Sequence, residues 1–206
     1  MTKNIQRYCN ALFPDLKGMG TWGHVDLNSF AIHMREIYDA ATVASKCKDP
    51  YEFDKWVRFY HKLLGINYSY GGYLEDRKEL WSGHYQEALK AVHYGVDFTV
   101  PECTSVHIPT DGVLIDKYID TDQDGGWGGR LTFRTAHGHL LFGHLKITNT
   151  KKNYTAGDLI GCIAPSDTNG GWWPHLHVQL MKEFTKDVDG YGAHYDGVSK
   201  DYICPY

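Results

Sequence analysis

Twelve of the 206 residues are histidines, and several of them stand at spacings that can bind a metal ion. His93 is followed by Asp97, and His175 is followed by His177. Imidazole nitrogens and carboxylate oxygens are usual ligands of catalytic zinc, which takes three protein ligands and leaves a fourth position for water. Zinc lowers the pKa of that water to about 7 and polarises carbonyl groups. The residue types therefore suit metal-assisted hydrolysis.

Spacing alone does not select these residues. With 12 histidines and 18 aspartates, random order gives about one His-x-x-x-Asp and roughly 0.7 His-x-His. The chain holds two of each, because His107/Asp111 and His137/His139 have the same spacings. The choice between the pairs must come from their surroundings.

The segment 92–100 alternates apolar and polar residues. This pattern predicts a half-buried strand with His93 and Asp97 on its polar face. A fully extended strand would place the two residues roughly 13 Å apart, too far for one zinc ion. The chain must therefore bend between them, and Gly95 can adopt the conformation that a bend requires.

The competing pairs lie in turn sequences. Asp111 follows Pro109-Thr110 and precedes Gly112, which predicts a turn-forming role. His137 and His139 flank a glycine between two apolar runs and are predicted to lie at an exposed hairpin tip. His175 and His177 instead share the polar face of a strand whose other face is apolar.

His144 lies in a strand that is otherwise apolar. A lone histidine there is usually a satisfied core residue, but hydrolysis at zinc also needs a proton carrier near the open coordination position. Both interpretations stay open on this pattern. The remaining histidines have no such context and are predicted to be surface or packing residues: His24, His33, His61, His84 and His194.

The elements that must position these side chains change character near residue 65. Helical spacing of apolar residues predicts one helix whose face contains Phe30, Met34, Ile37, Tyr38 and Ala41. A second helix is predicted from Asp49, its cap, to Leu64, with a stripe that is either buried or a docking surface. Strands are predicted at 91–100, 104–108, 112–119, 129–135, 139–147, 159–164 and 175–181.

These elements predict an α+β fold, with a mainly antiparallel β-sheet groove domain over residues 91–206. An N-terminal helical extension and linker, residues 1–90, precedes it. The net charge of −4 gives no general attraction to nucleic acid. No stretch approaches the roughly 20 apolar residues of a transmembrane helix. The start shows no signal peptide, so the compartment stays open between the cytoplasm and export by another route.

Two other metal-binding patterns are weak. Three aspartates alternate in the loop 120–129, but no glutamate closes it at the distance that a calcium loop requires. Five cysteines without a Cys-x-x-Cys pair argue against a thiolate zinc site and favour free thiols.

Four ordered segments resemble the lysostaphin-like metallopeptidases. They are His93-Tyr-Gly-Val-Asp97, Phe142-Gly-His144-Leu145, Gly157-Asp-Leu-Ile-Gly161 and His175-Leu-His177. The resemblance covers about residues 91–181. It implies a β-sheet groove and a zinc metallo-endopeptidase that cleaves peptides of bacterial cell-wall peptidoglycan.

The resemblance also implies roles for five residues. His93, Asp97 and His177 would bind one zinc ion, and His144 and His175 would form a catalytic pair beside it. One of the pair would accept the proton of the attacking water, and the other would assist the oxyanion or the leaving amine. Which of the two does which stays open.

This sequence departs from the family pattern at several positions. Cys103 replaces a usual glycine, and Val178-Gln179 replace a usual Phe-Glu. The loop Asn169–Pro174 is unusually aromatic, and its tryptophans can either bind substrate or pack. With the segment Gly71–Arg77, this loop resembles a less-studied branch of the family. A zinc hydrolase acting on another amide and an inactive binding or regulatory protein therefore remain alternatives.

Overall fold

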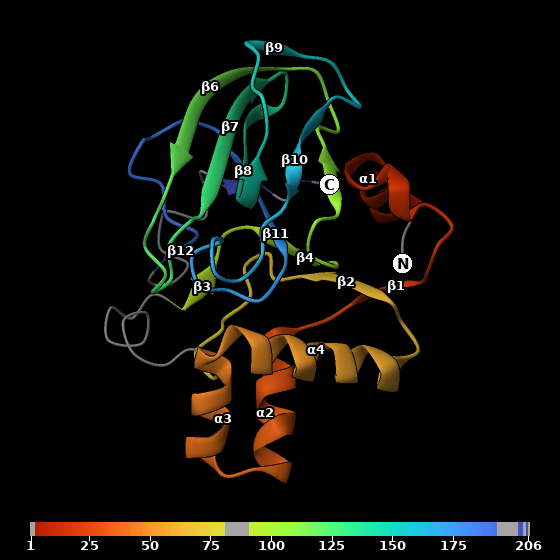
Figure 1. Cartoon of the computed structure of the whole chain (residues 1–206), viewed down its shortest axis with the longest axis vertical. Helices are drawn as coiled ribbons and strands as arrows, with labels where there is room; N and C mark the ends of the chain where they lie inside the picture. Colours follow the sequence, from red (N-terminus) through yellow and green to blue (C-terminus); the bar gives the residue numbers. More distant parts are fainter. Residues whose placement is uncertain (1–2, 81–90, 193–201, 204, 206) are drawn as a thin grey trace.

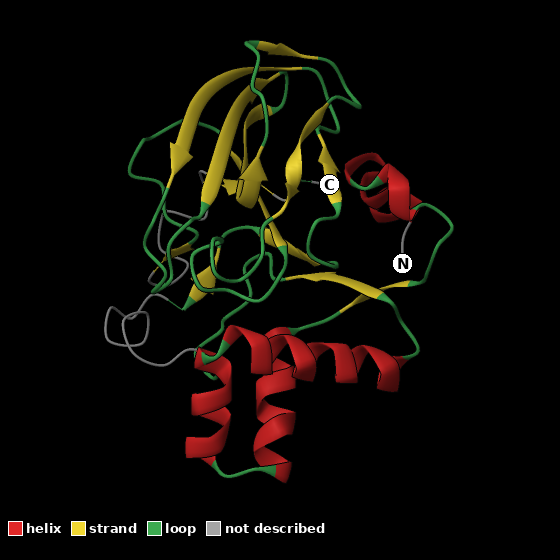
Figure 2. Cartoon of the chain, in the orientation of Figure 1, coloured by secondary structure: helices red, strands yellow, loops and turns green. Residues whose placement is uncertain are grey.

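The computed structural model describes residues 3–80, 91–192, 202–203 and 205 (Figure 1). It confirms the α+β class, since helices lie beside a large and mostly antiparallel sheet (Figure 2). None of the described helices is both long and apolar enough to cross a membrane. The helices are α1 (Lys3–Leu12), the 3-10 turn η1 (Pro14–Leu16), α2 (Leu27–Ile37), α3 (Ala40–Lys48) and α4 (Pro50–Leu64).

The main sheet has the strand order β1-β2-β4-β11-β8-β7-β6-β9 in the described part of the chain. β10 pairs with β5 and β8, β13 pairs with β11, and β3 and β12 form a separate pair. Among the strand pairs of the described residues, β1–β2 alone is parallel. The strands are β1 (Trp22–His24), β2 (Tyr68–Gly71), β3 (Val92–His93), β4 (Val96–Thr99), β5 (Ser105–His107), β6 (Gly112–Ile119), β7 (Gly129–Thr135), β8 (Gly138–Ile147), β9 (Asn153–Tyr154), β10 (Leu159–Ile163), β11 (Leu176–Met181), β12 (Tyr191–Gly192) and β13 (Tyr202–Ile203).

The helix predicted from Asp49 to Leu64 is confirmed as α4. The side chain of Asp49 accepts hydrogen bonds from the first-turn backbone, Pro50 begins the helix, and Gly65 ends it in the left-handed conformation. The buried side of the helix contains Phe53 and Val57, whereas the predicted stripe residue Leu64 is exposed.

The single helix predicted around Phe30–Ala41 is wrong, because the chain breaks after Ile37. Asp39 caps a new helix there, with its side chain accepting a hydrogen bond from the backbone of Thr42. Phe30 and Met34 are buried as predicted, but Ile37 and Tyr38 are exposed at the turn. Two short helices, α2 and α3, therefore run side by side (Figure 1).

The helices pack against the loop that precedes β11. The ring of Phe53 on α4 lies 4.9 Å from the ring of Trp173, and both side chains are buried. Phe30 on α2 joins the same cluster through a contact with Tyr60, 5.0 Å between ring centroids. The stripe on α4 is thus a packing surface, and the docking alternative does not apply to its buried residues.

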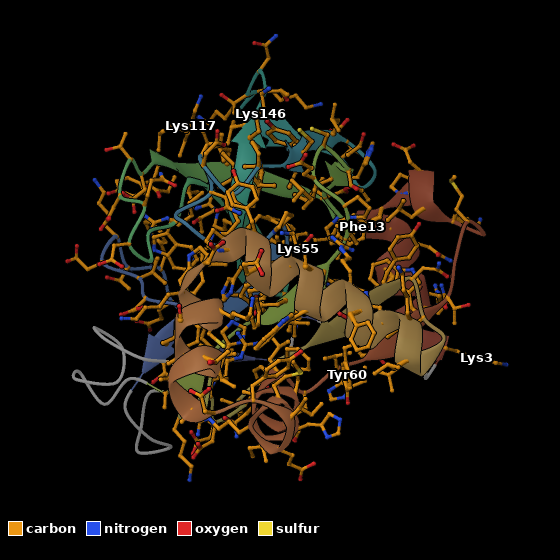
Figure 3. The ribbon with its side chains drawn as sticks, turned by 60° about the horizontal axis from the view of Figure 1, so that its bottom comes forward. Lys3, Phe13, Lys55, Tyr60, Lys117 and Lys146 are labelled. Carbon is orange, nitrogen blue, oxygen red and sulfur yellow. The ribbon has the colours of Figure 1, made fainter. Side chains whose placement is uncertain are left out.

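The first 90 residues contribute to the sheet as well as to the helices. β1 and β2 extend the sheet beside β4, with Gly71 of β2 opposite Asp97. Helix α1, which the sequence analysis did not predict, packs on the sheet core through Ile5, Leu12 and the following Phe13 (Figure 3). The domain boundary between residues 90 and 91 stays a prediction, and it separates strands that pair in one sheet.

His61 is a packing residue, as predicted, and its environment makes the fold sensitive to acid. Its imidazole is buried on α4, with Nε2 at 2.9 Å from the Ser69 hydroxyl. Burial and the charge of Arg58 lower the pKa of His61 to about 4. Below pH 6.5 the imidazole is protonated in the unfolded chain but stays neutral in the folded protein. The stability of the fold is therefore unaffected by protonation of His61 above pH 6.5 and decreases as the pH falls toward 4.

We expect the variant His61→Gln to lose less stability in acid than the wild type. When the pH is lowered from 7 to 4.5, the unfolding free energy of the wild type should fall by about 2 to 3 kcal/mol more than that of the variant, because only the wild type has the buried neutral His61. Urea unfolding of both proteins at the two pH values measures this difference. Equal losses in the two proteins would contradict the prediction.

Candidate metal centre

Three buried side chains converge at the junction of β3, β4 and β11: His93, Asp97 and His177. His93 Nε2 lies 3.0 Å from His177 Nδ1 and 3.4 Å from Asp97 Oδ1, and His177 Nδ1 lies 3.1 Å from the same oxygen. Ligand bonds of about 2.0–2.1 Å in a tetrahedral zinc site separate neighbouring ligand atoms by roughly 3.3 Å. The three atoms are therefore spaced as one zinc ion would require.

Hydrogen bonds on the far side of each ring fix which nitrogen faces the centre. His93 Nδ1 donates to the carbonyl of Gly72 at 2.9 Å, which leaves Nε2 without a proton. His177 Nε2 donates to Oε1 of Gln179 at 3.0 Å, which leaves Nδ1 without one. Gln179 stands where the family pattern has a glutamate, so the group that accepts this hydrogen bond carries no negative charge.

The centre has the charge pattern of a cation site. Burial, together with the charge of Arg77, lowers the pKa of His93 to about 3, so His93 is neutral at pH 7. Burial opposes ionisation of Asp97, but the charges of His93 and Arg77 outweigh it and hold the pKa of Asp97 well below its usual range. Since His93 is neutral, Arg77 is the partner that matters at pH 7. Two lone pairs and a carboxylate oxygen then face one another without a proton, and a divalent cation relieves their repulsion.

The bend between His93 and Asp97 lies where the sequence predicts it. β3 ends at His93 and β4 begins at Val96, with β3 pairing to β12 and β4 pairing to β2 and β11. The role of Gly95 differs from the predicted one, since its backbone is not left-handed. A Cβ atom at residue 95 would lie 2.5 Å from the His177 ring, so glycine is needed for the close approach of a candidate ligand.

His144 and His175 lie beside the candidate ligands, with 4.5 Å between their ring centroids. His144 Nδ1 donates to the carbonyl of Asn169 at 2.7 Å, and His175 Nδ1 donates to that of Trp173 at 2.8 Å. Each Nε2 is therefore free to accept a proton. Burial lowers the pKa of His175 to about 4, and burial with its histidine neighbours lowers the pKa of His144 well below its usual value.

The backbone at His144 is unusual. Its φ of 63° is left-handed, which few residues other than glycine adopt. The cause is a bulge, since Gly143 and His144 of β8 lie opposite the single residue Arg130 of β7. His144 N donates to Trp127 O, and His144 O accepts from Ala164 N, so the bulge is held on both sides. Such strain costs about 1–3 kcal/mol and concentrates at functional sites.

The centre opens into a small cavity of about 40 Å³, lined in part by Trp127, His144, Trp172 and His177. The two tryptophans of the aromatic loop have different roles. Trp173 is buried and stacks on His175 at 4.1 Å between ring centroids, which is a packing role. Trp172 lines the cavity, with its indole nitrogen donating to the carbonyl of Gly126 at 2.9 Å. Substrate contact is therefore possible for Trp172 and not for Trp173.

The competing pairs lie away from the centre. Asp111 accepts a hydrogen bond from Ala156 N in an exposed bend, as its turn sequence predicts. His137 is exposed at the turn between β7 and β8, and His139 donates to the carbonyl of Lys182. Of the remaining histidines, His84 and His194 lie outside the described residues. Cys9, Cys47, Cys103 and Cys162 are free thiols, and Cys204 also lies outside the described part of the chain.

The sequence analysis missed the residues that surround the candidate ligands. Arg77 and the carbonyl of Gly72 contact Asp97 and His93, yet both belong to a segment in which no metal-related role was predicted. The only signal was the resemblance of Gly71–Arg77 to a less-studied branch of the family. Trp127 was also missed, because it lies in a glycine-rich loop whose sequence pattern indicates only a turn.

Comparisons with known proteins bear on this site. No family model matches the chain. Over 90 residues, or 43% of its length, the chain is 31% identical to the DD-carboxypeptidase/endopeptidase Mpg of Neisseria meningitidis serogroup B. The protein of the same name from Neisseria gonorrhoeae matches with the same values. The match covers 20% of these relatives, so the chain spans about one fifth of their length.

Some solved structures are also similar to part of the chain. The catalytic domain of the antimicrobial peptidase lysostaphin from Staphylococcus simulans is 24% identical, with a TM-score of 0.39, over 56% of this chain and 77% of that one. A zinc-containing peptidase from Vibrio cholerae is 25% identical, with a TM-score of 0.38, over 45% of this chain and 28% of that one. The sequence match to the Neisseria proteins spans 90 residues, about the length over which the four ordered motifs resemble the lysostaphin-like metallopeptidases.

Proposed function

We propose that this chain is a zinc-dependent metallo-endopeptidase that hydrolyses peptide bonds, with bacterial cell-wall peptidoglycan as its substrate. The observation that carries the proposal is the convergence of His93, Asp97 and His177, whose proton-free ligand atoms lie 3.0–3.4 Å apart in a buried site. The sequence match to a DD-carboxypeptidase/endopeptidase supports the reaction class. The choice of peptidoglycan rests on the resemblance to the lysostaphin-like family.

His93 Nε2, Asp97 Oδ1 and His177 Nδ1 would hold the metal ion. Zinc at this position would act as a Lewis acid on the scissile carbonyl and would acidify a water molecule. His144 and His175 would move the protons, because both are neutral at pH 7 and each directs Nε2 away from its carbonyl partner. His144 lines the cavity and is therefore better placed than His175 to contact a substrate.

Metal analysis combined with a digestion assay tests this proposal. We expect one zinc ion per purified chain, and we expect purified peptidoglycan incubated with the zinc-loaded protein to release fragments with new amino termini. Mass analysis of those fragments identifies the cleaved bond. Dialysis against a chelator should abolish release, and added zinc should restore it.

The alternatives give different results in the same experiment. A protein that holds zinc and leaves peptidoglycan intact but hydrolyses other peptide amides would be a zinc hydrolase with another substrate. A protein that binds zinc or peptidoglycan without hydrolysing any amide would be an inactive binding or regulatory relative. A purified chain that holds no zinc after exposure to excess metal would contradict the proposal as a whole.

A further inference from the structure

Behind the candidate ligand Asp97 lies a buried guanidinium group. Arg77 has no exposed side-chain surface, and its Nη1 donates to Asp97 Oδ2 at 2.7 Å. The other carboxylate oxygen, Oδ1, faces His93 and His177. The two oxygens of Asp97 therefore have separate partners, one toward arginine and one toward the centre.

Arg77 is itself held from three directions. Its Nε donates to Glu75 Oε2 at 3.0 Å, and Nη1 also donates to the Tyr191 hydroxyl at 2.9 Å. Glu75 Oε1 accepts from the backbone of Asn28, in the first turn of α2, at 2.8 Å. A helix N-terminus favours negative charge, so this contact stabilises the carboxylate that neutralises Arg77. The chain of contacts runs from α2 through Glu75 and Arg77 to Asp97.

The backbone of residues 72–77 packs closely against both Arg77 and His93. Gly72 has a φ of 105°, and a Cβ atom there would lie 2.3 Å from Arg77 Nη2 and 2.6 Å from His93 Nδ1. Arg77 N donates to Ala91 O, and His93 N donates to Glu75 O, so the segment is fastened beside β3. Residues 72–77 thus contact two of the three candidate ligands from behind.

We propose that Arg77 is a positioning residue of the metal centre, which keeps Asp97 a one-oxygen ligand by occupying its second oxygen, with Glu75 neutralising the arginine. This inference rests on the proposed zinc site. A carboxylate with both oxygens free can bind a metal through one or both of them. With Oδ2 bound to Arg77, the metal gains one oxygen from Asp97 and keeps a coordination position for water.

Charge must be separated from geometry in the test. Removing Arg77 alone changes the charge next to a divalent cation and leaves the buried carboxylate of Glu75 without its cationic partner. The double variant Glu75→Gln/Arg77→Met removes one charge of each sign, so the net charge around the centre is unchanged. Glu75→Gln alone changes the charge but leaves the bond from Arg77 to Asp97 in place. Arg58→Met is the matched control, because Arg58 forms a partly buried pair with Asp54 away from the centre.

The visible absorption spectrum of the cobalt(II)-loaded full chain reports the coordination number, since four-coordinate cobalt absorbs more strongly than five-coordinate cobalt. We expect a weaker spectrum and 10- to 100-fold lower activity in the double variant. Glu75→Gln should bind metal more weakly but keep the wild-type spectrum. Arg58→Met should match the wild type in both measurements.

Arg77→Lys provides a second comparison should the double variant not fold. Lysine keeps the charge but carries a single ammonium group, which cannot bond Asp97 and Glu75 as the two edges of a guanidinium do. We expect an intermediate spectrum and intermediate activity. Wild-type spectra in the double variant, or in Arg77→Lys if only that variant folds, would overturn this inference alone. A wild-type chain that binds neither zinc nor cobalt would overturn the proposed function and this inference with it.

Discussion

Replacing His177 by alanine is expected to abolish stoichiometric zinc binding. His177 supplies one of three protein ligands, and its Nδ1 is the atom closest to both other ligand atoms, at 3.0 and 3.1 Å. Structural zinc sites bind with about 10–16 kcal/mol, so losing one ligand of three or four should cost about 3 to 4 kcal/mol, or roughly 10²- to 10³-fold in affinity. Zinc should then be lost on dialysis, and the proposed peptidase activity should disappear with it.

Competition with a chelator of known affinity measures the zinc dissociation constant of the variant. His137→Ala is the matched control, because His137 belongs to the competing His-x-His pair and is exposed at a turn. That control should keep wild-type affinity. A His177→Ala protein that retains one tightly held zinc ion would remove His177 from the ligand set.

Replacing His144 by alanine should leave zinc in place and lower turnover by about 10²- to 10⁴-fold, the usual effect of losing a general acid or base. His144 lines the cavity beside the centre and is neutral at pH 7, since burial lowers its pKa. Its nitrogens are not among the clustered candidate ligand atoms, which belong to His93, Asp97 and His177. Zinc content and kcat on peptidoglycan fragments, measured on the same preparation, test the two halves of this prediction.

The left-handed backbone at His144 calls for a second variant. Asparagine tolerates this conformation better than alanine, so His144→Asn should fold at least as well as His144→Ala. Both should have equally low turnover, because neither side chain transfers a proton near neutral pH. Full turnover in either zinc-loaded variant would rule out a catalytic role for His144.

The local pattern of apolar and turn residues was sufficient to predict most strands around the candidate metal centre. β6 and β7 have the predicted bounds, and β8, β10 and β11 differ from them by one residue at an end. These strands alternate or run apolar over five or more residues, and turn residues separate them. The bend in 91–100 was predictable because one zinc ion cannot reach both His93 and Asp97 on a fully extended strand, where they would lie roughly 13 Å apart. The ligand and catalytic roles themselves stay predictions, although the structure brings all five side chains together.

Other elements carried weaker or misleading local signals. Ile5, Cys9 and Leu12 are buried at helical spacing in α1, a pattern that was present but short. β1 and β2 have three and four residues, and their pairing joins segments more than 40 residues apart, which no local pattern encodes. Tyr38 and Ala41 extended the predicted apolar stripe past the end of α2, since hydrophobic spacing was given more weight than the capping aspartate at residue 39.

Long-range contacts were the least predictable part. Nothing in the segment around Arg77 indicates which carboxylate a buried arginine will meet, because its partners Asp97 and Tyr191 lie 20 and 114 residues away. The positive φ of His144 likewise depends on the register between β7 and β8. Sequence patterns were sufficient to predict the candidate ligands. The residues that contact and orient these ligands, such as Arg77, could be identified only from the fold.

The pairing of β2 with β4 has a practical consequence for work with shorter chains. A truncated protein that starts at residue 91 would lack β1 and β2, so β4 would become an edge strand with unpaired N–H and C=O groups. Such edges promote intermolecular strand pairing and aggregation. Poor solubility of that fragment would then reflect a missing neighbour strand rather than a defective catalytic centre. A soluble fragment should keep α1 as well as β1 and β2, so that both the core and the edge of the sheet stay covered.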